Sequence, residues 1–384
     1  MKQLHRNLLF FAIIFLACVS AKAAIIIVSN NPNVPGQYSN IQTAIDAAAP
    51  DDTLYVQGSV TSYGDVTITK KLKIIGSGML PDNTSHLSTT LGSIYYRVSA
   101  DGTSSPSGSA ITGCNIYVLH LGFSNIGSVS YMVSNISIYR NRISAIMNNG
   151  YASAETSYSG IHIFNNIIGT LGVDRLGGNS VVNNNIFING VQSTGYIDSG
   201  NWILINNFIG ERITGCYNAT IVNNIIYSSS SSYNNNSSNR YCNFTKNLFY
   251  SYNNYQFPVN FLNNSSENNT FNTTYENILN QNPSFVKYTI NDPIYSYSMS
   301  NPPSGPFVDF HLNNDSPGKN YGTDGTDIGI YGGTTPFVEG ATTDSRFRYF
   351  PMPAMPQMLD LTITNPSIPA NSTLNVNFKA EKKN

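Results

Sequence analysis

Short apolar segments, each centred on an asparagine, recur through the middle of the chain. In every copy, Ile, Val, Leu or Phe residues lie on both sides of the asparagine. The aligned positions are Asn141, Asn166, Asn185, Asn207, Asn224 and Asn247, with a weaker seventh copy at Asn269-Thr-Phe271. Successive copies are 17 to 25 residues apart. A repeat of this length predicts an architecture of stacked, similar units.

The composition of each copy favours strands over helices. Short runs of β-branched and aromatic residues are separated by Asn, Gly and Ser, which is typical of strands joined by turns. The frame of leucine-rich repeats is missing, and a propeller blade needs about 40 residues. The chain is therefore predicted to be all-β: a single-stranded, right-handed parallel β-helix solenoid over residues 24–340, with the asparagine-containing coils over 111–271.

The recurring asparagine has a physical role in such a fold. Coils stack at about 4.8 Å, the spacing between strands, so equivalent residues lie directly above one another. An asparagine side chain carries both a donor and an acceptor, so a column of them can form a ladder of hydrogen bonds. Asparagine also tolerates the left-handed backbone of a tight corner. We interpret the six aligned asparagines as a structural ladder, with the neighbouring Ile, Val and Phe stacked inside the coils.

Different patterns precede and follow the repeats. Ser39 is a candidate N-cap for a helix over 39–49, with Ile41 and Ile45 on one apolar face. Such a helix would cover one open end of the coil stack. The repeats stop before 341–384, which is predicted to be a Pro-rich linker followed by a short β segment of alternating apolar and polar residues.

The first 23 residues (1–23) carry the features of a secretory signal peptide. An apolar run from Leu8 to Val19 follows a basic start, and Ala21-Lys-Ala23 fits a cleavage site. Cys18 leaves a lipoprotein as a second interpretation, although the residues before it match a lipobox poorly. The apolar run is too short to span a bilayer, and no later segment is long enough. We expect a secreted or cell-surface protein, periplasmic or extracellular, with no transmembrane segment.

Charge and cysteine content narrow the function further. The net charge is −1 and only 11% of residues are charged, which leaves no basic face for nucleic acid. The three cysteines beyond the signal peptide are widely spaced and include no C-x-x-C pair, so they suit neither a disulfide framework nor a zinc site. We expect Cys114, Cys216 and Cys242 to be buried thiols. Two of them end identical tetrapeptides, Ile111-Thr-Gly-Cys114 and Ile213-Thr-Gly-Cys216.

Two groups of motifs flank the repeats. In front lie Ile41-Gln-Thr-Ala-Ile-Asp46 and Lys71-Leu-Lys-Ile-Ile-Gly76; behind lie Asn282-Pro-Ser-Phe-Val286, Asp309-Phe-His-Leu312 and Asp327-Ile-Gly-Ile-Tyr331. With the asparagine coils, they resemble the secreted, pectate-lyase-like right-handed parallel β-helix proteins of bacteria over residues 39–335. The resemblance implies an entry helix and a closing coil over 282–333. That superfamily includes polysaccharide lyases, polygalacturonases and many proteins with no assigned reaction, so the resemblance bears on fold more than on activity.

The resemblance directs attention to acidic residues. Enzymes of this kind use clustered aspartates for hydrolysis, or aspartates that bind Ca²⁺ together with a basic residue. Carboxylates are sparse through the repeats of this chain. The candidates that stacking could gather on one loop edge are Asp174, Asp198 and Glu211, with Arg175 and Arg212 beside two of them. The competing interpretation is a set of solvent-exposed ion pairs.

A candidate cation site lies near the end of the β-helix region. Asp315, Asp324 and Asp327 could bind Ca²⁺ through carboxylate oxygens. The alternative is a turn rich in Gly and Asp that closes the chain. No other metal or cofactor is expected.

Tyrosine is the remaining signal, with 25 copies against a single tryptophan. Tyrosines in the loops near 250–255 and 288–297 are candidates for stacking on sugar rings, and inward-facing aromatic columns are the alternative. We expect a monomeric, secreted or cell-surface protein that binds or scaffolds polysaccharide or cell-surface glycan without a clear catalytic site. A β-helix polysaccharide lyase or glycoside hydrolase is one alternative function, and an adhesin or structural rod is another.

Overall fold

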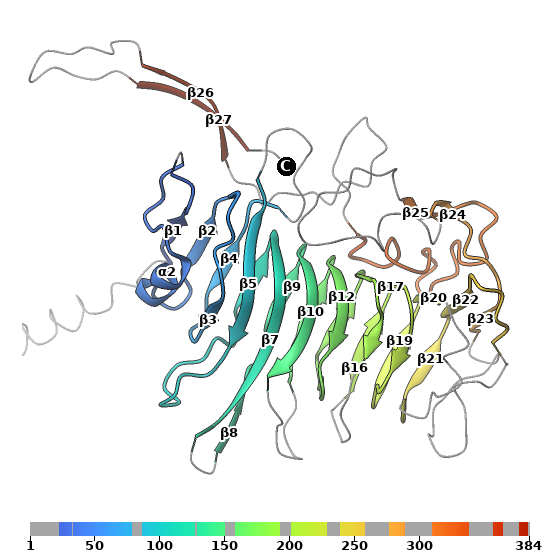
Figure 1. The fold of residues 1–384 in the computed structure, drawn as a ribbon. Helices are drawn as coiled ribbons and strands as arrows, with labels where there is room; N and C mark the ends of the chain where they lie inside the picture. The colour runs from blue at the N-terminus through green and yellow to red at the C-terminus, as the bar shows by residue number, and fades with distance from the viewer. Residues whose placement is uncertain are drawn as a thin grey trace, which may run out of the picture.

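The computed structural model is an all-β molecule built on two long parallel sheets (Figure 1). It describes residues 23–32, 34–78, 87–126, 129–149, 158–192, 201–228, 239–257, 276–288, 309–337, 356–363 and 376–382. In spatial order, the first sheet contains β1 (Ile25–Val28), β2 (Thr53–Val56), β4 (Lys73–Ile75), β6 (Ala110–Thr112), β9 (Ser137–Tyr139), β11 (His162–Phe164), β13 (Val181–Asn183), β16 (Trp202–Ile205), β19 (Ala219–Val222) and β21 (Asn243–Thr245). The second contains β3 (Val66–Ile68), β5 (Thr89–Tyr96), β7 (Cys114–Ile126), β10 (Arg142–Asn149), β12 (Ile167–Gly172), β14 (Ile186–Phe187), β17 (Phe208–Ile209), β20 (Ile225–Ser228), β22 (Leu248–Ser251) and β23 (Ile278–Leu279), with β15 (Val191–Gln192) and β18 (Ile213–Thr214) beside this path.

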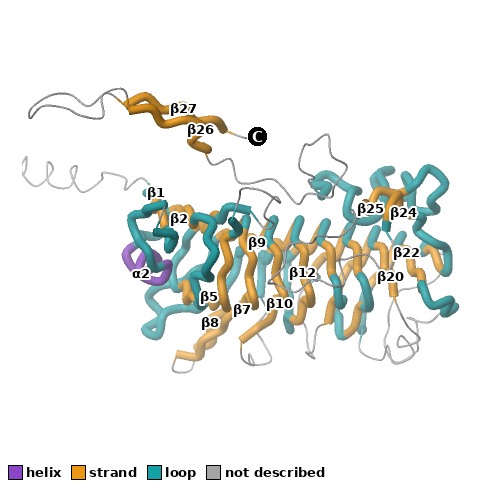
Figure 2. Tube along the Cα trace, turned by 45° about the horizontal axis from the view of Figure 1, so that its top comes forward, coloured by secondary structure: helices purple, strands orange, loops and turns teal. Residues whose placement is uncertain are grey.

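The chain visits the two sheets in turn, and we call one passage through both sheets a coil. Neighbouring strands along both sheets pair in parallel, as in the pairs β4–β6 and β20–β22. Figure 2 shows the strands side by side along an elongated body. Because parallel neighbours are contributed by successive coils, this arrangement is consistent with a parallel β-helix.

A column of buried side chains runs through the first sheet. Its members are in register from strand to strand and are inaccessible to solvent: Ile111, Ile138, Ile163, Val182, Leu204, Ile221 and Phe244. Burying each aliphatic or aromatic side chain of this size contributes about 1.5–3 kcal/mol. The alternation of these residues with exposed neighbours explains why each short run forms a strand.

The six aligned asparagines form one continuous column at the corner between the sheets. Each is fully buried, and its Oδ1 accepts hydrogen bonds of 2.9–3.2 Å from the preceding rung, from both N–H and Nδ2 where that rung is an asparagine. Cys114 donates to Asn141 at one end, and Asn247 donates to Asn277 at the other. The seventh member is thus Asn277, because the last interval is 30 residues; Asn269, the sequence-based choice, lies outside the described residues.

The sequence alone suggests two roles for one asparagine, the hydrogen-bond ladder and the left-handed corner. In the structure, two adjacent residues perform them. The ladder asparagines do not adopt a positive φ. The residue directly before each of them does, with φ between 52° and 59° at Arg140, Asn165, Asn184, Asn206, Asn223, Lys246 and Glu276. In the frequent Asn-Asn pair, the first residue therefore makes the left-handed corner and the second makes the ladder.

The repeated tetrapeptides mark two corners with the same hydrogen bonds. The Cys114 N–H donates to Asn141 Oδ1, and the Cys216 N–H donates to Asn239 Oδ1, at 3.0 and 2.9 Å. In both cases the asparagine Nδ2 donates back to the carbonyl of the first tetrapeptide residue. Cys114 stands in the ladder column, whereas Cys216 follows β18 at a different corner. All three described cysteines are buried and form no disulfide.

One short helix, α2 (Ile41–Ala47), precedes the coils. Its N-cap is Asn40, one residue after the predicted Ser39, because Asn40 Oδ1 accepts from the Thr43 N–H at 2.9 Å. The Gln42 side chain bonds both the N–H and the carbonyl of Thr67 in β3, at 2.8 and 3.1 Å. β3 is the edge strand of the second sheet, so this contact satisfies backbone groups that an edge exposes.

Residues 309–337 lie along the side of the coils, and we call them the strap. Within the closing coil expected over 282–333, the described residues 282–288 and 309–333 contribute no strand to either parallel sheet. Instead, β24 (Phe285–Lys287) and β25 (Asp309–Leu312) form a separate antiparallel pair. Strap residues including Phe310, Leu312, Ile328 and Ile330 form a second hydrophobic core with Ile167, Ile186, Phe208, Ile225, Leu248 and Ile278.

The strap explains why apolar residues directly follow the ladder asparagines. These residues face away from the coil interior, and the second core buries them. The strap is also anchored to the left-handed corners: Asn184 Nδ2 donates to the carbonyls of Ile330 and Gly332 at 2.9 and 2.8 Å, and Asn223 Nδ2 donates to Thr323 at 3.0 Å. The sequence interpretation that these Ile and Phe residues stack inside is wrong for this position.

Two antiparallel hairpins extend the parallel architecture. β7 continues beyond its parallel neighbours and pairs with β8 (Val129–Met132). β26 (Pro356–Ile363) pairs with β27 (Val376–Lys382) in the segment where a C-terminal β element was expected. No helix among the described residues has the length and hydropathy needed to cross a membrane.

Candidate functional site

In the N-terminal half of the second sheet, the strap covers none of the outer face among the residues that the structure describes. Here β5 and β10 each have 8 residues and β7 has 13, whereas β14 and β17 have 2 each. Figure 1 shows the long strands side by side. The first coil residue that packs against the strap is Ile167 in β12. Outward-facing residues of the earlier long strands therefore remain accessible.

Three rows of outward residues cross this face from coil to coil. The strand register aligns Gly92, Tyr117, Ser144 and Gly169 in the first row. It aligns Ser93, Val118, Ala145 and Thr170 in the second row, and Tyr95, His120, Met147 and Gly172 in the third. In β7, the first two rows are represented by the successive residues Tyr117 and Val118, which lie between the buried Ile116 and Leu119. Side chains of a straight strand alternate between its two faces, so β7 bends where these two successive residues both face outward.

Tyr117 is the most exposed aromatic residue of this face. Its side chain is 59% exposed, and its neighbours in the flanking coils are Gly92 and Ser144. Among the described residues, no ring or cation stacks on it. Gly92 is required here because a Cβ atom would collide with the carboxylate of Asp65, which accepts the Ser93 N–H at 2.7 Å. The result is an open aromatic ring whose neighbour in the preceding coil, Gly92, lies against the Asp65 carboxylate.

A stack of polar and aromatic groups forms the third row. The Tyr95 and His120 rings are 4.7 Å apart and parallel to within 1°. The Arg97 guanidinium lies over the other face of the stack, 4.7 Å from the Tyr95 ring centre. Met147, 43% exposed, is in register with His120 on the next coil. Because the Tyr95 and His120 rings stack face to face, their edges point outward, and the row forms a raised ridge with polar atoms along it.

The surroundings of His120 disfavour its charged form. Burial, reinforced by the charge of Arg97, lowers the pKa of His120 from its usual value. Its Nδ1 atom is buried and has no hydrogen-bond partner among the described groups. A proton on this nitrogen would find no acceptor among these groups.

The residues predicted as catalytic do not gather in the part of the chain that the structure describes. Asp174 accepts a hydrogen bond of 3.3 Å from Asn148. Register pairs Leu171 with Val191 and Val191 with Ile213, so Asp174 and Glu211 are two coils apart and on opposite sides of this row. Two coils alone correspond to about 10 Å. Arg175 and Arg212 follow their acidic neighbours to these separate corners, and Asp198 lies outside the described residues, so the set as a whole stays a prediction.

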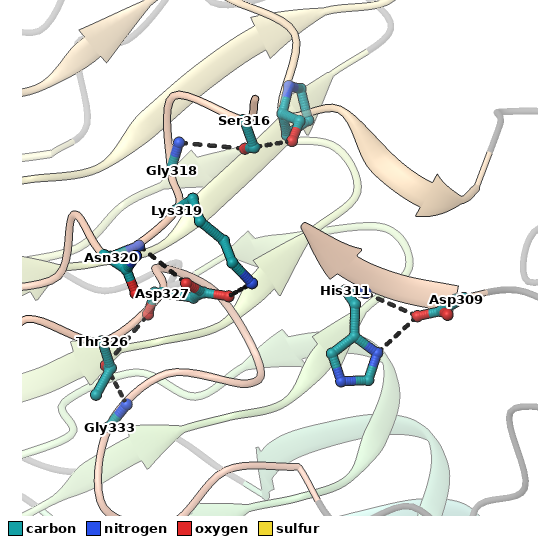
Figure 3. Close-up of polar contacts among 10 residues, drawn as sticks. Asp309, His311, Ser316, Gly318, Lys319, Asn320, Thr326, Asp327 and Gly333 are labelled. Atoms are coloured by element: carbon teal, nitrogen blue, oxygen red, sulfur yellow. Dashed lines mark hydrogen bonds and ion pairs between the residues drawn. The ribbon is translucent and has the colours of Figure 1, made fainter. Parts of the chain in front are cut away.

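The three aspartates of the predicted cation site make separate contacts, and Figure 3 shows those of Asp327. Asp327 pairs with Lys319 at 2.9 Å and accepts the Asn320 N–H at 2.9 Å. Asp324 accepts from the Thr326 side chain and N–H, and these bonds lower the pKa of Asp324. Asp315 is exposed. No three His, Cys, Asp or Glu residues of the described ranges are grouped as metal ligands, so the geometry favours the turn interpretation.

Asp309 and His311 form a close pair in the strap (Figure 3). Asp309 Oδ1 accepts from the His311 N–H at 2.9 Å and contacts the ring Nδ1 at 2.7 Å. The hydrogen bond from His311 lowers the pKa of Asp309. The imidazole lies flat on the Tyr331 ring, with centres 3.8 Å apart. Because one ring face stacks on Tyr331 and one ring nitrogen contacts Asp309, we assign this pair to holding β25 against the segment around Tyr331.

The tyrosines expected to bind sugars pack elsewhere. Tyr288 is buried, and Tyr250 and Tyr252 pack on the second core through Tyr227, at ring-centre distances of 5.5 and 5.4 Å. Residues 289–297 lie outside the described ranges. The alternative of packed aromatic clusters therefore describes the tyrosines that the structure includes in these loops: Tyr250, Tyr252 and Tyr288 pack in the second core, and Tyr255 packs against the first.

The sequence interpretation missed Tyr95 and Tyr117. Both lie ahead of Asn141, the first ladder asparagine, and the search was centred on the segments that contain the aligned asparagines. A signal was present in Cys114–Gly122, where Tyr117 and His120 interrupt buried Ile and Leu positions. The position of Gly92 beside Tyr117 depends on strand register and had no sequence signature.

Comparison with known proteins does not indicate a function for this chain. No protein-family model matches the chain, and neither does any curated protein. The three-row face is therefore the candidate site on physical grounds alone.

Proposed function

We propose that this chain is a secreted or cell-surface protein that binds polysaccharide or cell-surface glycan on the three-row face of its second sheet. The observation that carries the proposal is Tyr117, an exposed ring with small neighbours and the Asp65 carboxylate close by. Sugar rings present C–H faces that pack on aromatic rings. Their hydroxyl groups donate to carboxylates and accept from guanidinium groups, which Arg97 supplies at the other side of the face.

The fold belongs to the same proposal. The two parallel sheets and the buried asparagine column support a right-handed parallel β-helix of the pectate-lyase-like kind, in which α2 covers the first coil. The apolar N-terminal run supports export through a signal peptide over 1–23, with lipid attachment at Cys18 as the less favoured route. We propose a monomer, with neither nucleic acid nor a resident metal needed for binding.

Binding without catalysis is favoured over a lyase or hydrolase. A glycosidase places its two carboxyl groups about 5–9.5 Å apart, and Asp174 and Glu211 are separated by the register described above. Near Tyr117, Asp65 is one carboxylate and the opposite side of the face carries Arg97. A structural rod or adhesin would not need an open aromatic ring of this kind.

The test is a polysaccharide array probed with the mature chain, beginning at Ala24. Retention on each polysaccharide and release of reducing ends or unsaturated products are measured together. Tyr117→Ala is expected to weaken retention about tenfold, since an aromatic contact contributes about 0.5–1.5 kcal/mol beyond its buried area. Tyr241→Ala is the matched control, because Tyr241 is 50% exposed at another corner.

Two outcomes would count against the proposal. Unchanged retention by Tyr117→Ala would remove the face from glycan binding. Steady product release by the parent chain would establish an enzyme and would redirect attention to Asp174, Glu211 and the undescribed Asp198.

A further inference from the structure

A buried carboxylate lies beside the residue that precedes the first strand. Asp52 is 5% exposed. Its Oδ2 accepts the Ala49 N–H at 2.8 Å, within the turn between α2 and β2. Its Oδ1 accepts the Ala24 N–H at 2.6 Å. Figure 1 shows β1, β2 and α2 together at one end of the body. Each oxygen of the Asp52 carboxylate therefore binds a backbone N–H, and one of these belongs to the residue directly before β1.

No basic side chain of the described residues forms an ion pair with Asp52. The lysines nearby in the sequence are directed elsewhere. Lys71 pairs with Asp51, Lys70 Nζ donates to backbone carbonyls at the C-terminal end of α2, and Lys73 is exposed. A buried carboxylate without a cation is costly. The Ala24 nitrogen is the position at which processing of the chain could supply that cation.

We infer that Asp52 binds the amino terminus of the mature chain. The inference rests on the proposed export through a signal peptide and does not depend on glycan binding. Hydrolysis of the Ala23–Ala24 peptide bond consumes one water, breaks the C–N bond, leaves a carboxylate on Ala23 and converts the Ala24 amide nitrogen into an ammonium group. Because this nitrogen already contacts Asp52 Oδ1, removal of the signal peptide turns a hydrogen bond into an ion pair. Ala24 is exposed, so the other ammonium hydrogens reach solvent.

The sheet begins at the same residue. The Ala24 carbonyl accepts the Thr53 N–H at 2.9 Å, and Ile25 is in register with Thr53. Cleavage after Ala23 thus leaves no residue ahead of the first hydrogen bond between β1 and β2. A cut one or two residues earlier would move the charge, since each extended residue spans up to about 3.3–3.6 Å. β1 is the edge strand of the first sheet, so the ion pair would hold the exposed end of the coil stack.

The test compares two chains that differ only at the amino terminus. One begins at Ala24, and the other carries Gly-Ser before Ala24, which restores an amide at this nitrogen. At pH 7, the extension should raise the equilibrium constant for unfolding about tenfold, which is about 1.4 kcal/mol, because it removes a full positive charge from beside the carboxylate. Chemical denaturation followed by circular dichroism measures the two constants. Equal constants would overturn the inference.

Asp52→Asn shows whether the effect depends on this carboxylate. The asparagine is uncharged, so the extension should change the unfolding constant of Asp52→Asn by less than about twofold. Asp51→Asn is the matched control, because Asp51 is exposed, adjacent in sequence and paired with Lys71; there the tenfold effect should remain. A tenfold effect that persists in Asp52→Asn would assign it to crowding by the added residues and would overturn the inference.

The pH dependence gives a readout that does not require Asp52→Asn to fold. An α-amino group ordinarily has a pKa of about 7.7–8.0, and an adjacent carboxylate raises that pKa in the folded state. The ion pair therefore contributes fully below this range and is lost as pH rises through the raised pKa. The difference between the two chains should shrink above about pH 8 and be small by about pH 10.5. Titration of Lys70, Lys71 and Lys73 is common to both chains and cancels. A difference that is unchanged at the higher pH would contradict an ammonium group at this position.

Mass spectrometry of the chain that cells export establishes where processing occurs. A mature chain that begins at Ala24 is expected. Another amino terminus, or a lipid at Cys18, would overturn the inference and would leave glycan binding to its own test with Tyr117→Ala. Absence of glycan binding by a chain that begins at Ala24 and shows the pH-dependent difference would remove the proposed binding function and retain the ion pair.

Discussion

Removing one ladder side chain should destabilise the protein strongly, and Asn185 is the most informative position. Asn185 is fully buried. Its Nδ2 donates to the carbonyls of Ile163 and Asn183 at 2.8 and 3.0 Å and to Asn207 Oδ1 at 3.1 Å. Its Oδ1 accepts from the N–H and Nδ2 of Asn166, both at 3.0 Å. Asn185→Ala therefore removes five hydrogen bonds from the centre of the stack.

The expected loss follows from the groups that remain. Asn185→Ala leaves the Asn166 N–H and two backbone carbonyls buried without these partners. An unsatisfied buried group costs about 1–3 kcal/mol, so the free energy of unfolding should fall by about 3–5 kcal/mol after partial relaxation. Asn185→Asp is nearly isosteric and keeps the acceptor, but it turns an oxygen toward two carbonyls. We expect Asn185→Asp to be at least as destabilising as Asn185→Ala.

Equilibrium unfolding in guanidinium chloride, followed by circular dichroism, measures these changes. Hydrogen exchange of the Asn166 amide reports the same site locally. Asn189→Ala is the control, since Asn189 is exposed in the same coil and should change stability by no more than about 0.5 kcal/mol. The reasoning is refuted if Asn185→Ala and Asn189→Ala have the same unfolding free energy and the Asn166 amide exchanges at the parent rate.

Further expectations concern the strap, the thiols and the stacked histidine. Phe310→Ala, at a strap residue 2% exposed, should lower the unfolding free energy by about 3–5 kcal/mol, and an unchanged denaturation midpoint would contradict a second core. Burial raises the pKa of Cys114 and Cys242 to about 12 and that of Cys216 well above its usual value, so thiol reagents should label none of them at neutral pH until denaturant is added; labelling of the native chain would contradict this. Because burial lowers the pKa of His120 in the folded state, the unfolded chain takes up its proton first, and stability should fall as pH decreases below the ordinary histidine value of about 6.5. Chemical denaturation at pH 7 and pH 5 checks this, and an equal loss in His120→Gln would assign the pH dependence to other groups.

The candidate site was harder to anticipate than the fold. Tyr117 and His120 interrupt buried positions of a single strand, so their outward placement could be predicted from alternation. The open space beside Tyr117 could not, because it depends on Gly92 in the preceding coil and on the Asp65 carboxylate that excludes a Cβ there. The predicted grouping of Asp174, Asp198 and Glu211 on one loop edge stays a prediction, because Asp198 lies outside the described residues. The register shows only that Asp174 and Glu211 are two coils apart.

The sequence by itself determined the coil repeat, the parallel all-β class and six members of the asparagine column. These features recur within each coil, because a corner residue, a ladder asparagine and an inward aliphatic residue are needed once per turn of the chain. The strap and the three-row face were decided by the tertiary structure. Asn184 meets Ile330 across 146 residues of sequence, and the three rows of the face exist only through pairing between coils. Contacts between distant segments depend on strand register and on which segment covers each surface. A local pattern of apolar and polar residues contains no information about either.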